Sequence, residues 1–161
     1  MFPTIVTIGV YGYTESVFFQ TLKAAQVELF VDIRRRRALR GTQYAFANSN
    51  RLQPRLAELG IRYLHRLDLA PSNATRQIQA IHDRLAKTAR RQRSGLAPAF
   101  VAAYERECLA AFDAKQFLID IGPDTTVVAL FCVEREPAAC HRSLVAARLS
   151  AAGLTVTHLL P

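Results

Sequence analysis

Short apolar runs rich in β-branched residues alternate along the chain with longer segments whose apolar residues recur every three or four positions. A run of the first kind predicts a buried β-strand, and a segment of the second kind predicts an amphipathic helix. Five strands are predicted in this way, at Thr4–Ile8, Glu28–Ile33, Ile61–Leu64, Thr126–Cys132 and Leu154–Leu159. The run TVVALFC is the most hydrophobic of the five, which predicts a central strand.

The segments between the predicted strands carry start and stop signals of helices. The predicted helices follow Thr14, run from Asn48 or Ser49 to Gly60, cover roughly Thr75–Arg93 and Pro98–Phe117, and end at Gly153. Strands and helices therefore alternate along the whole chain, which is typical of a parallel sheet covered on both faces. The sequence predicts an α/β fold: one three-layer domain over residues 1–161, with a mainly parallel five-stranded sheet and helices on both faces.

Length and composition agree with a globular domain and exclude several other classes of protein. The chain has 161 residues, of which half are hydrophobic, and it contains neither an internal repeat nor a linker. No apolar run approaches the ~20 residues that a membrane span needs, and no basic segment precedes the first apolar run as in a secretory signal. Three cysteines are too few for a disulfide framework and suggest a reducing compartment. We expect a cytoplasmic protein that does not contact a membrane.

The charge balance indicates an anionic partner. Twenty-one basic residues against 13 acidic ones give a net charge of +8, and nine arginines fall between Ile33 and Arg66 beside a single acid, Glu58. Such a cluster on a small domain suggests a phosphate-bearing ligand or a nucleic acid. A second basic cluster lies between Arg84 and Arg93, and a solvated surface is at least as good an interpretation for it.

Polar and reactive side chains follow most of the predicted strands at their carboxyl ends, where open parallel sheets bind their ligands. Because they come from separate segments yet meet at one edge, we expect them to form a site. The candidate catalytic residues are Asp32, His65, Cys132, Glu134, Cys140 and His141, and the candidate anion-binding residues are Arg34, Arg142 and Ser143. A buried carboxylate such as Asp32 needs a partner, and the arginines next to it are candidates.

The segment CVEREPAACHRS, residues 132–143, contains the largest number of candidate site residues. Pro137 suits the first position of a helix, which places Cys140, His141, Arg142 and Ser143 in its early turns. The amino end of a helix favours an anion, and an arginine there calls for a negative partner, either a carboxylate or a bound phosphate. A thiol in that field has a lowered pKa and nucleophilic character.

Two interpretations of the cysteines stay open. Most free cysteines are small buried hydrophobic residues, and we favour that interpretation for Cys132 and for Cys108; for Cys140 neither is preferred. Residues able to bind a metal are present, but the spacing C-x7-CH matches none of the usual structural zinc spacings, so no metal site is predicted. Nucleotide-binding glycine motifs are absent as well, and no cofactor is indicated.

With these residues in view, the chain resembles a bacterial and archaeal family known as domain of unknown function 488. The likeness includes TIGVYGYTESVFFQTL, VDIR at Val31–Arg34, GIRYLH at Gly60–His65, and LFCVEREPAACHRSLVA, whose C-x-E-x5-CHR motif is the most specific part. The resemblance implies a compact α/β domain with Cys132, Glu134, Cys140, His141 and Arg142 in the characteristic motif, and it supplies no reaction. Many members have His-Ser after TIG, where this chain has Val10 and Tyr11.

Three functions remain in competition, and whether the protein is an enzyme stays undecided. The first is binding or processing of a phosphorylated or nucleotide-like ligand at the carboxyl edge of the sheet. The second is a nucleic-acid-binding module that uses the arginine-rich loop. The third is thiol chemistry at Cys132 or Cys140, by sulfur transfer or redox sensing; a weaker likeness to rhodanese sulfurtransferases points the same way. We place the first ahead of the second, and the third behind both.

Overall fold

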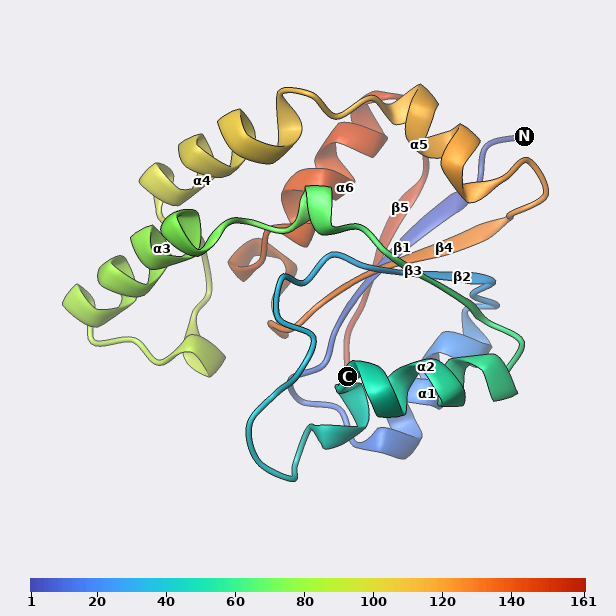
Figure 1. Ribbon diagram of the computed structural model, residues 1–161, viewed down its shortest axis with the longest axis horizontal. Coiled ribbons are helices and arrows are strands. Elements are labelled where there is room, and N and C mark those ends of the chain that lie inside the picture. Colours follow the sequence, from blue (N-terminus) through green and yellow to red (C-terminus); the bar gives the residue numbers. More distant parts are fainter.

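Five parallel strands form one sheet in the computed structural model, which describes residues 1–161 (Figure 1). The strands are β1 Thr4–Gly9, β2 Leu29–Asp32, β3 Arg62–His65, β4 Val127–Cys132 and β5 Val156–Leu159. Their order across the sheet is β3-β2-β4-β1-β5, and every neighbouring pair is parallel. The α/β fold class is confirmed, as are all five strands, and β4 is central as its hydrophobicity predicts.

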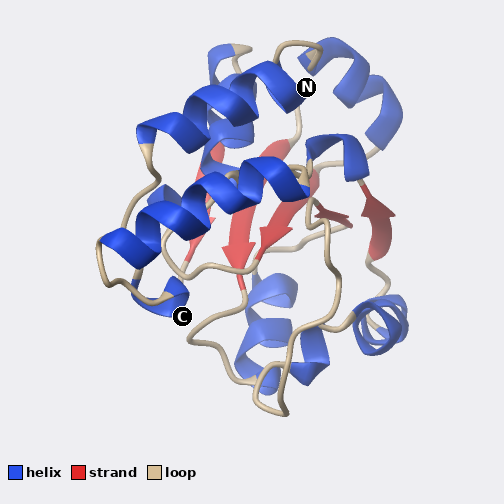
Figure 2. Cartoon of the chain, turned by 60° about the vertical axis from the view of Figure 1, so that its left-hand side comes forward, coloured by secondary structure: helices blue, strands red, loops and turns tan.

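Six α-helices cover the sheet in two layers. They are α1 Glu15–Ala24, α2 Ser49–Glu58, α3 Asn73–Leu85, α4 Pro98–Tyr104, α5 Ala114–Ile121 and α6 Arg142–Ala151. Helices α1 and α2 lie on one face of the sheet, and α5 and α6 lie on the other, with the α3–α4 pair projecting beyond the sheet (Figures 1 and 2). None of the helices combines the length and the apolar character that a membrane crossing requires.

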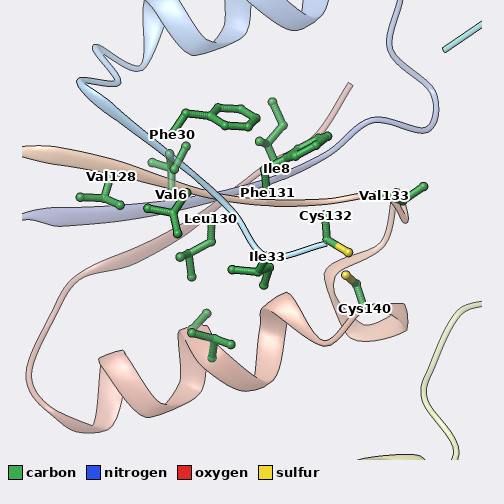
Figure 3. Close-up of a cluster of buried hydrophobic side chains, with 14 of the residues drawn as sticks. Val6, Ile8, Phe30, Ile33, Val128, Leu130, Phe131, Cys132, Val133 and Cys140 are labelled. Atoms are coloured by element: carbon green, nitrogen blue, oxygen red, sulfur yellow. The ribbon is translucent and has the colours of Figure 1, made fainter. Parts of the chain in front are cut away.

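Successive side chains of the buried strands point to opposite faces of the sheet and form a core on each face. Phe30 of β2 and Phe131 of β4 lie 4.8 Å apart between ring centroids, and both rings contact Phe18 of α1. Leu130 and Ile33 point the other way, toward α6 (Figure 3). The central strands are buried on both faces, which explains why they read as continuous apolar runs rather than alternating ones.

Two helix predictions are wrong in their extent. The helix expected over Thr75–Arg93 ends at Leu85, because Lys87 adopts a left-handed conformation (φ 52°) that an α-helix cannot continue through. The helix expected over Pro98–Phe117 is two elements: α4, extended by a π-helical turn over Glu105–Leu109, and a separate α5. Asp113 begins α5 by accepting hydrogen bonds from the backbone N–H groups of Lys115 and Gln116.

The connections between strands create a crevice at the carboxyl end of β4. The chain leaves β1 and β2 toward α1 and α2 on one face, whereas it leaves β4 toward α6 on the other face (Figure 1). Loops that diverge in this way leave a gap between neighbouring strand ends, and ligands of open α/β sheets bind in such gaps. The loop after β2, residues 33–44, and the loop after β4, residues 133–141, therefore border one site.

Candidate functional site

A cavity of about 540 Å³ opens beside the carboxyl end of β4. Its lining includes only two carboxylates, those of Asp83 and Glu134, against eight arginines: Arg34, Arg35, Arg36, Arg40, Arg76, Arg90, Arg91 and Arg93. Cys132, Cys140 and His141 also line it. The cavity thus combines a strongly cationic wall with a floor of thiols and an imidazole.

Asp32 and Arg34 form a fully buried ion pair at the end of β2. Arg34 donates to both carboxylate oxygens through Nε (2.9 Å) and Nη2 (2.8 Å), and its backbone N–H donates to Oδ1 as well. Tyr63 Oη donates to Oδ2 at 2.8 Å. The partner predicted for Asp32 is therefore the adjacent arginine.

The same arginine has one unused donor. Nη1 of Arg34 is buried and makes no hydrogen bond with the protein, while the guanidinium lies 4.6 Å from the ring centroid of Phe131. A buried donor without a partner costs roughly 1–3 kcal/mol, so a hydrogen-bond acceptor brought to this N–H would stabilise the protein. Arg34 lines the cavity, so a molecule that enters the cavity is one source of such an acceptor.

A run of four arginines predicts mostly solvent-exposed side chains, with at least one turned back onto Asp32 or the site. Arg34 does turn back onto Asp32, but only Arg36 of the run 34–37 is exposed, so the expectation of a mostly exposed run is wrong. Arg35 donates to the carbonyls of Pro71 and Ala70, and Arg37 donates to the hydroxyl of Tyr63. The loop folds back because these donors find acceptors in β3 and in the segment between β3 and α3.

The floor of the cavity brings together three residues from β4 and the loop after it. The ligand-capable atoms of Cys132, Cys140 and His141 all lie within 4.8 Å of one another, and all three side chains are buried. Figure 3 shows the two sulfur atoms facing each other. His141 Nε2 lies 2.9 Å from the carbonyl oxygen of Ile33; since a carbonyl only accepts, Nε2 carries the proton and donates.

Burial and the neighbouring charges separate the pKa values of the two thiols. Burial raises the pKa of Cys132 well above its ordinary value. Burial acts in the same direction on Cys140, but the hydrogen bond from Cys132 and the charges of His141 and Arg142 outweigh it, so the pKa of Cys140 is lowered. Burial would lower the pKa of His141, and the adjacent Cys140 reverses this and raises it. Cys140 and His141 therefore each shift the pKa of the other toward its charged form.

Glu134 links this floor to the cationic wall. Its Oε1 accepts from Arg90 Nε (2.7 Å) and Arg93 Nη2 (2.9 Å), while Oε2 accepts from the Cys132 thiol at 3.7 Å. Arg93 also donates to Asp83 on α3 and to the carbonyl of Ala139. The second basic cluster, for which a solvated surface was at least as good an interpretation, thus contributes Arg90, Arg91 and Arg93 to the cavity.

Arg142 has a different environment from the one expected. It is fully buried, and its guanidinium donates to the carbonyls of Glu134 and Arg135 and to Thr7 Oγ1, with no carboxylate among its hydrogen-bond partners. Main-chain carbonyl oxygens accept the hydrogen bonds of the Arg142 guanidinium that were expected to bind a phosphate. Arg142 therefore fixes the turn after β4, and neither it nor Ser143, which donates to the carbonyl of Cys140, lines the cavity.

Helix α6 begins later in the chain than predicted. Pro137 opens a short 3₁₀ turn, and α6 begins only at Arg142, so Cys140 lies in extended conformation before the helix. His65 stands at the end of β3 with Nε2 2.8 Å from the carbonyl oxygen of Arg34, next to the cavity rather than in its lining. Of the nine predicted site residues, Arg34, Cys132, Glu134, Cys140 and His141 line the cavity, and Asp32 supports it from beneath.

The family model described as domain of unknown function DUF488 matches residues 15–149. The chain belongs to the DUF488 family. No curated protein and no solved structure matches it. The matched range includes every residue that lines the cavity except Tyr11, and it contains the segment C-x-E-x5-CHR, which forms the floor of the cavity.

The sequence did not indicate Arg76, a half-buried arginine of the cavity without an ion-pair partner. It lies on α3, and burial together with Arg90 and Arg36 lowers its pKa. An isolated arginine on a helix surface carries no local signal of such a role. Its neighbours come from two other segments, and only the tertiary fold brings them together.

Proposed function

We propose that the arginine-lined cavity binds a phosphorylated small molecule, with a nucleotide as the class of ligand to test first. The observation that carries the proposal is the unpartnered Nη1 of Arg34 in a wall lined by eight arginines. Phosphate oxygens are strong acceptors, and the planar fork of arginine matches their geometry.

The charge arrangement supports an anion of more than one unit charge. Both carboxylates of the lining are already engaged: Glu134 by Arg90 and Arg93, and Asp83 by Arg93 and by Gln79. Arg76 has no ion-pair partner, and burial together with Arg90 and Arg36 lowers its pKa, so an anion that enters the cavity would stabilise its charge. Charges of one sign in a concave site concentrate ligands of the opposite sign.

An aromatic pair at the rim supports a ligand that also carries a ring. The guanidinium of Arg91 lies 5.1 Å from the ring centroids of both Tyr11 and Tyr44. A guanidinium held flat against aromatic rings presents a second face on which a base or sugar ring can pack. Both tyrosines are themselves buried, so they orient Arg91 rather than offering a free stacking surface.

Calorimetric titration with a nucleoside, its monophosphate, its triphosphate and inorganic pyrophosphate tests the proposal. We expect binding of the phosphorylated compounds only, and a ligand at 100 times its Kd raises the free energy of unfolding by about 2.7 kcal/mol. Arg76→Gln is expected to weaken binding about tenfold, or about 1.4 kcal/mol. Arg84→Gln is the matched control, because Arg84 lies on the same helix, is exposed and does not line the cavity.

A single-stranded oligonucleotide separates this proposal from the nucleic-acid alternative. If the oligonucleotide binds more tightly than any small phosphate, with an affinity that falls steeply with salt and responds equally to Arg76→Gln and Arg84→Gln, the protein is a nucleic-acid-binding module. Equal loss of small-ligand binding in the two variants would also contradict a defined cavity site, because it reports only the net charge of the protein.

A further inference from the structure

We infer that Cys132, Cys140 and His141 form a binding site for a divalent transition-metal ion of the zinc type, with its fourth coordination position facing the cavity. Two sulfurs and one imidazole nitrogen make up a donor set that suits Zn²⁺. All three ligand atoms lie within 4.8 Å of one another, and all three side chains are buried. The inference rests on this cluster and does not depend on the phosphate proposal.

A hydrogen bond fixes His141 in the tautomer that a metal ligand needs. Its Nε2 donates to the carbonyl of Ile33 at 2.9 Å, which fixes the ring and leaves Nδ1 as the nitrogen able to coordinate. Metal-binding histidines ordinarily donate their second ring N–H to such an acceptor, and this partner holds the tautomer. Ring packing strengthens the restraint, since the His141 ring lies 5.3 Å from that of Tyr104 between centroids.

The donor atoms lie near the spacing that a tetrahedral ion requires. With Zn–S near 2.3 Å and Zn–N near 2.0–2.1 Å, ligand atoms of a tetrahedral site lie about 3.5–3.8 Å apart. Nδ1 of His141 is 3.8 Å from the sulfur of Cys132, all three donor atoms lie within 4.8 Å of one another, and the two sulfur atoms face each other. The backbone brings the donors near that spacing because Cys132 ends β4, whereas Cys140 and His141 end the turn that leads into α6.

The surroundings accommodate the charge of such an ion. Two thiolates neutralise a divalent cation, so the occupied site adds no net positive charge to a cavity already rich in arginine. Glu134 lies beside the site: Arg90 and Arg93 hold its Oε1, and its Oε2 loses the hydrogen bond from Cys132 when that thiol is deprotonated to bind the ion. Three protein ligands and one open position are the arrangement of catalytic zinc sites rather than of closed structural ones.

Metal titrations of the reduced, chelator-treated full chain test this site. We expect one equivalent of Zn²⁺ to bind, and Co²⁺ to give the visible bands of a tetrahedral ion together with a sulfur-to-cobalt charge-transfer band. Cys132→Ser and Cys140→Ser should each weaken Zn²⁺ binding by about 100-fold or more, since loss of an outer partner alone costs 10–100-fold. Each should also reduce the charge-transfer band by about half, because one of two thiolates is removed.

Cys108→Ser is the control variant, because Cys108 is buried like the other two cysteines and lies outside the cluster. It should bind both metals as the unaltered protein does. Arg76→Gln should also keep the Zn²⁺ affinity, so that failure of the metal site and failure of the phosphate site are told apart.

Two results would overturn the inference. The first is a cobalt complex of the unaltered protein without a sulfur charge-transfer band, a measurement that stays decisive even if a serine variant fails to fold. The second is a disulfide between Cys132 and Cys140 that forms in air at the same rate with and without excess Zn²⁺. That result would make the two cysteines a redox pair that no metal protects.

Discussion

The carbonyl oxygen of Ile33 accepts a hydrogen bond from His141, a residue 108 positions later in the chain. This bond joins the loop after β2 to the turn before α6, so one contact sets the distance between the two borders of the cavity. Ile33 is fully buried, and its carbonyl would otherwise lie unsatisfied beneath the site. The floor of the cavity is thus a rigid part of the fold.

Replacing His141 with phenylalanine keeps a ring of similar size and removes the donor. We expect His141→Phe to lower the free energy of unfolding by about 1–3 kcal/mol, because the carbonyl of Ile33 then lacks its partner. Urea unfolding in the presence of a chelator measures this. His82→Phe is the control: His82 is exposed on α3, and its replacement should stay within about 0.5 kcal/mol of the unaltered protein.

Asp32→Asn tests the buried ion pair. The amide keeps the shape of the carboxylate but leaves Arg34 charged, buried and without a counter-ion, and breaking such a pair costs about 3–5 kcal/mol. Thermal and urea unfolding report the loss. Asp124→Asn changes an exposed carboxylate, and a similar loss in that variant would show that net charge, rather than the pair, sets the stability.

Arg142→Lys keeps the positive charge and loses the fork that spans two carbonyls. We expect it to destabilise the protein by about 2–4 kcal/mol with no ligand present, because a lysine ammonium reaches fewer of the three acceptors. Arg148→Lys, on the exposed face of α6, is the matched control. If Arg142→Lys leaves the stability unchanged but weakens phosphate binding, Arg142 binds the anion, as the sequence predicted.

Gly9→Ala tests how closely two loops approach. A Cβ on Gly9 would lie 1.8 Å from the carbonyl oxygen of Glu134 and 2.9 Å from Nη1 of Arg142, and neither group is free to move. We expect a loss of about 4 kcal/mol or more, which is the range of severe packing defects. Gly95→Ala meets no atom within 4 Å and should leave the unfolding midpoint nearly unchanged.

Cys108 gives the protein a pH dependence at alkaline pH. Burial raises the pKa of its thiol from an ordinary value of 9.0 to about 11, so the native state retains a proton that the unfolded state loses. The stabilisation is complete below pH 9 and is lost as the pH rises to about 11. Over that interval, the stability of the native protein relative to Cys108→Ala should fall by about 1–2 kcal/mol. A constant difference would mean that the thiol titrates alike in both states.

The elements of the fold with local signals were predictable, and those that depend on distant contacts were not. Apolar runs located all five strands, and the length and hydrophobicity of the run ending at Cys132 placed it at the centre. The break between α4 and α5 was missed because alanines and leucines continue across it, and only the cap at Asp113 marks a new start.

In the candidate site, too, residues with local signals were predictable and contacts between distant segments were not. The strand ends identified Cys132, Glu134, Cys140 and His141, because the carboxyl edge of a parallel sheet collects them. The pairing of Glu134 with Arg90 and Arg93 spans more than 40 residues and has no signature in either segment. The prediction for Arg142 was wrong because a cation at a helix start was expected to face a carboxylate or a bound phosphate, whereas two main-chain carbonyls accept its hydrogen bonds.

The strand order β3-β2-β4-β1-β5 has a consequence for how the chain acquires its structure during synthesis. Strand β1 is made first, yet its only neighbours are β4 and β5, which lie beyond residue 126. Until residues 127–132 have left the ribosome, β1 has no strand with which to pair, and β1 and β2 cannot join because β4 belongs between them. Assembly of this sheet therefore waits for β4, and fragments that stop before Val127 should remain unfolded and exposed to proteases.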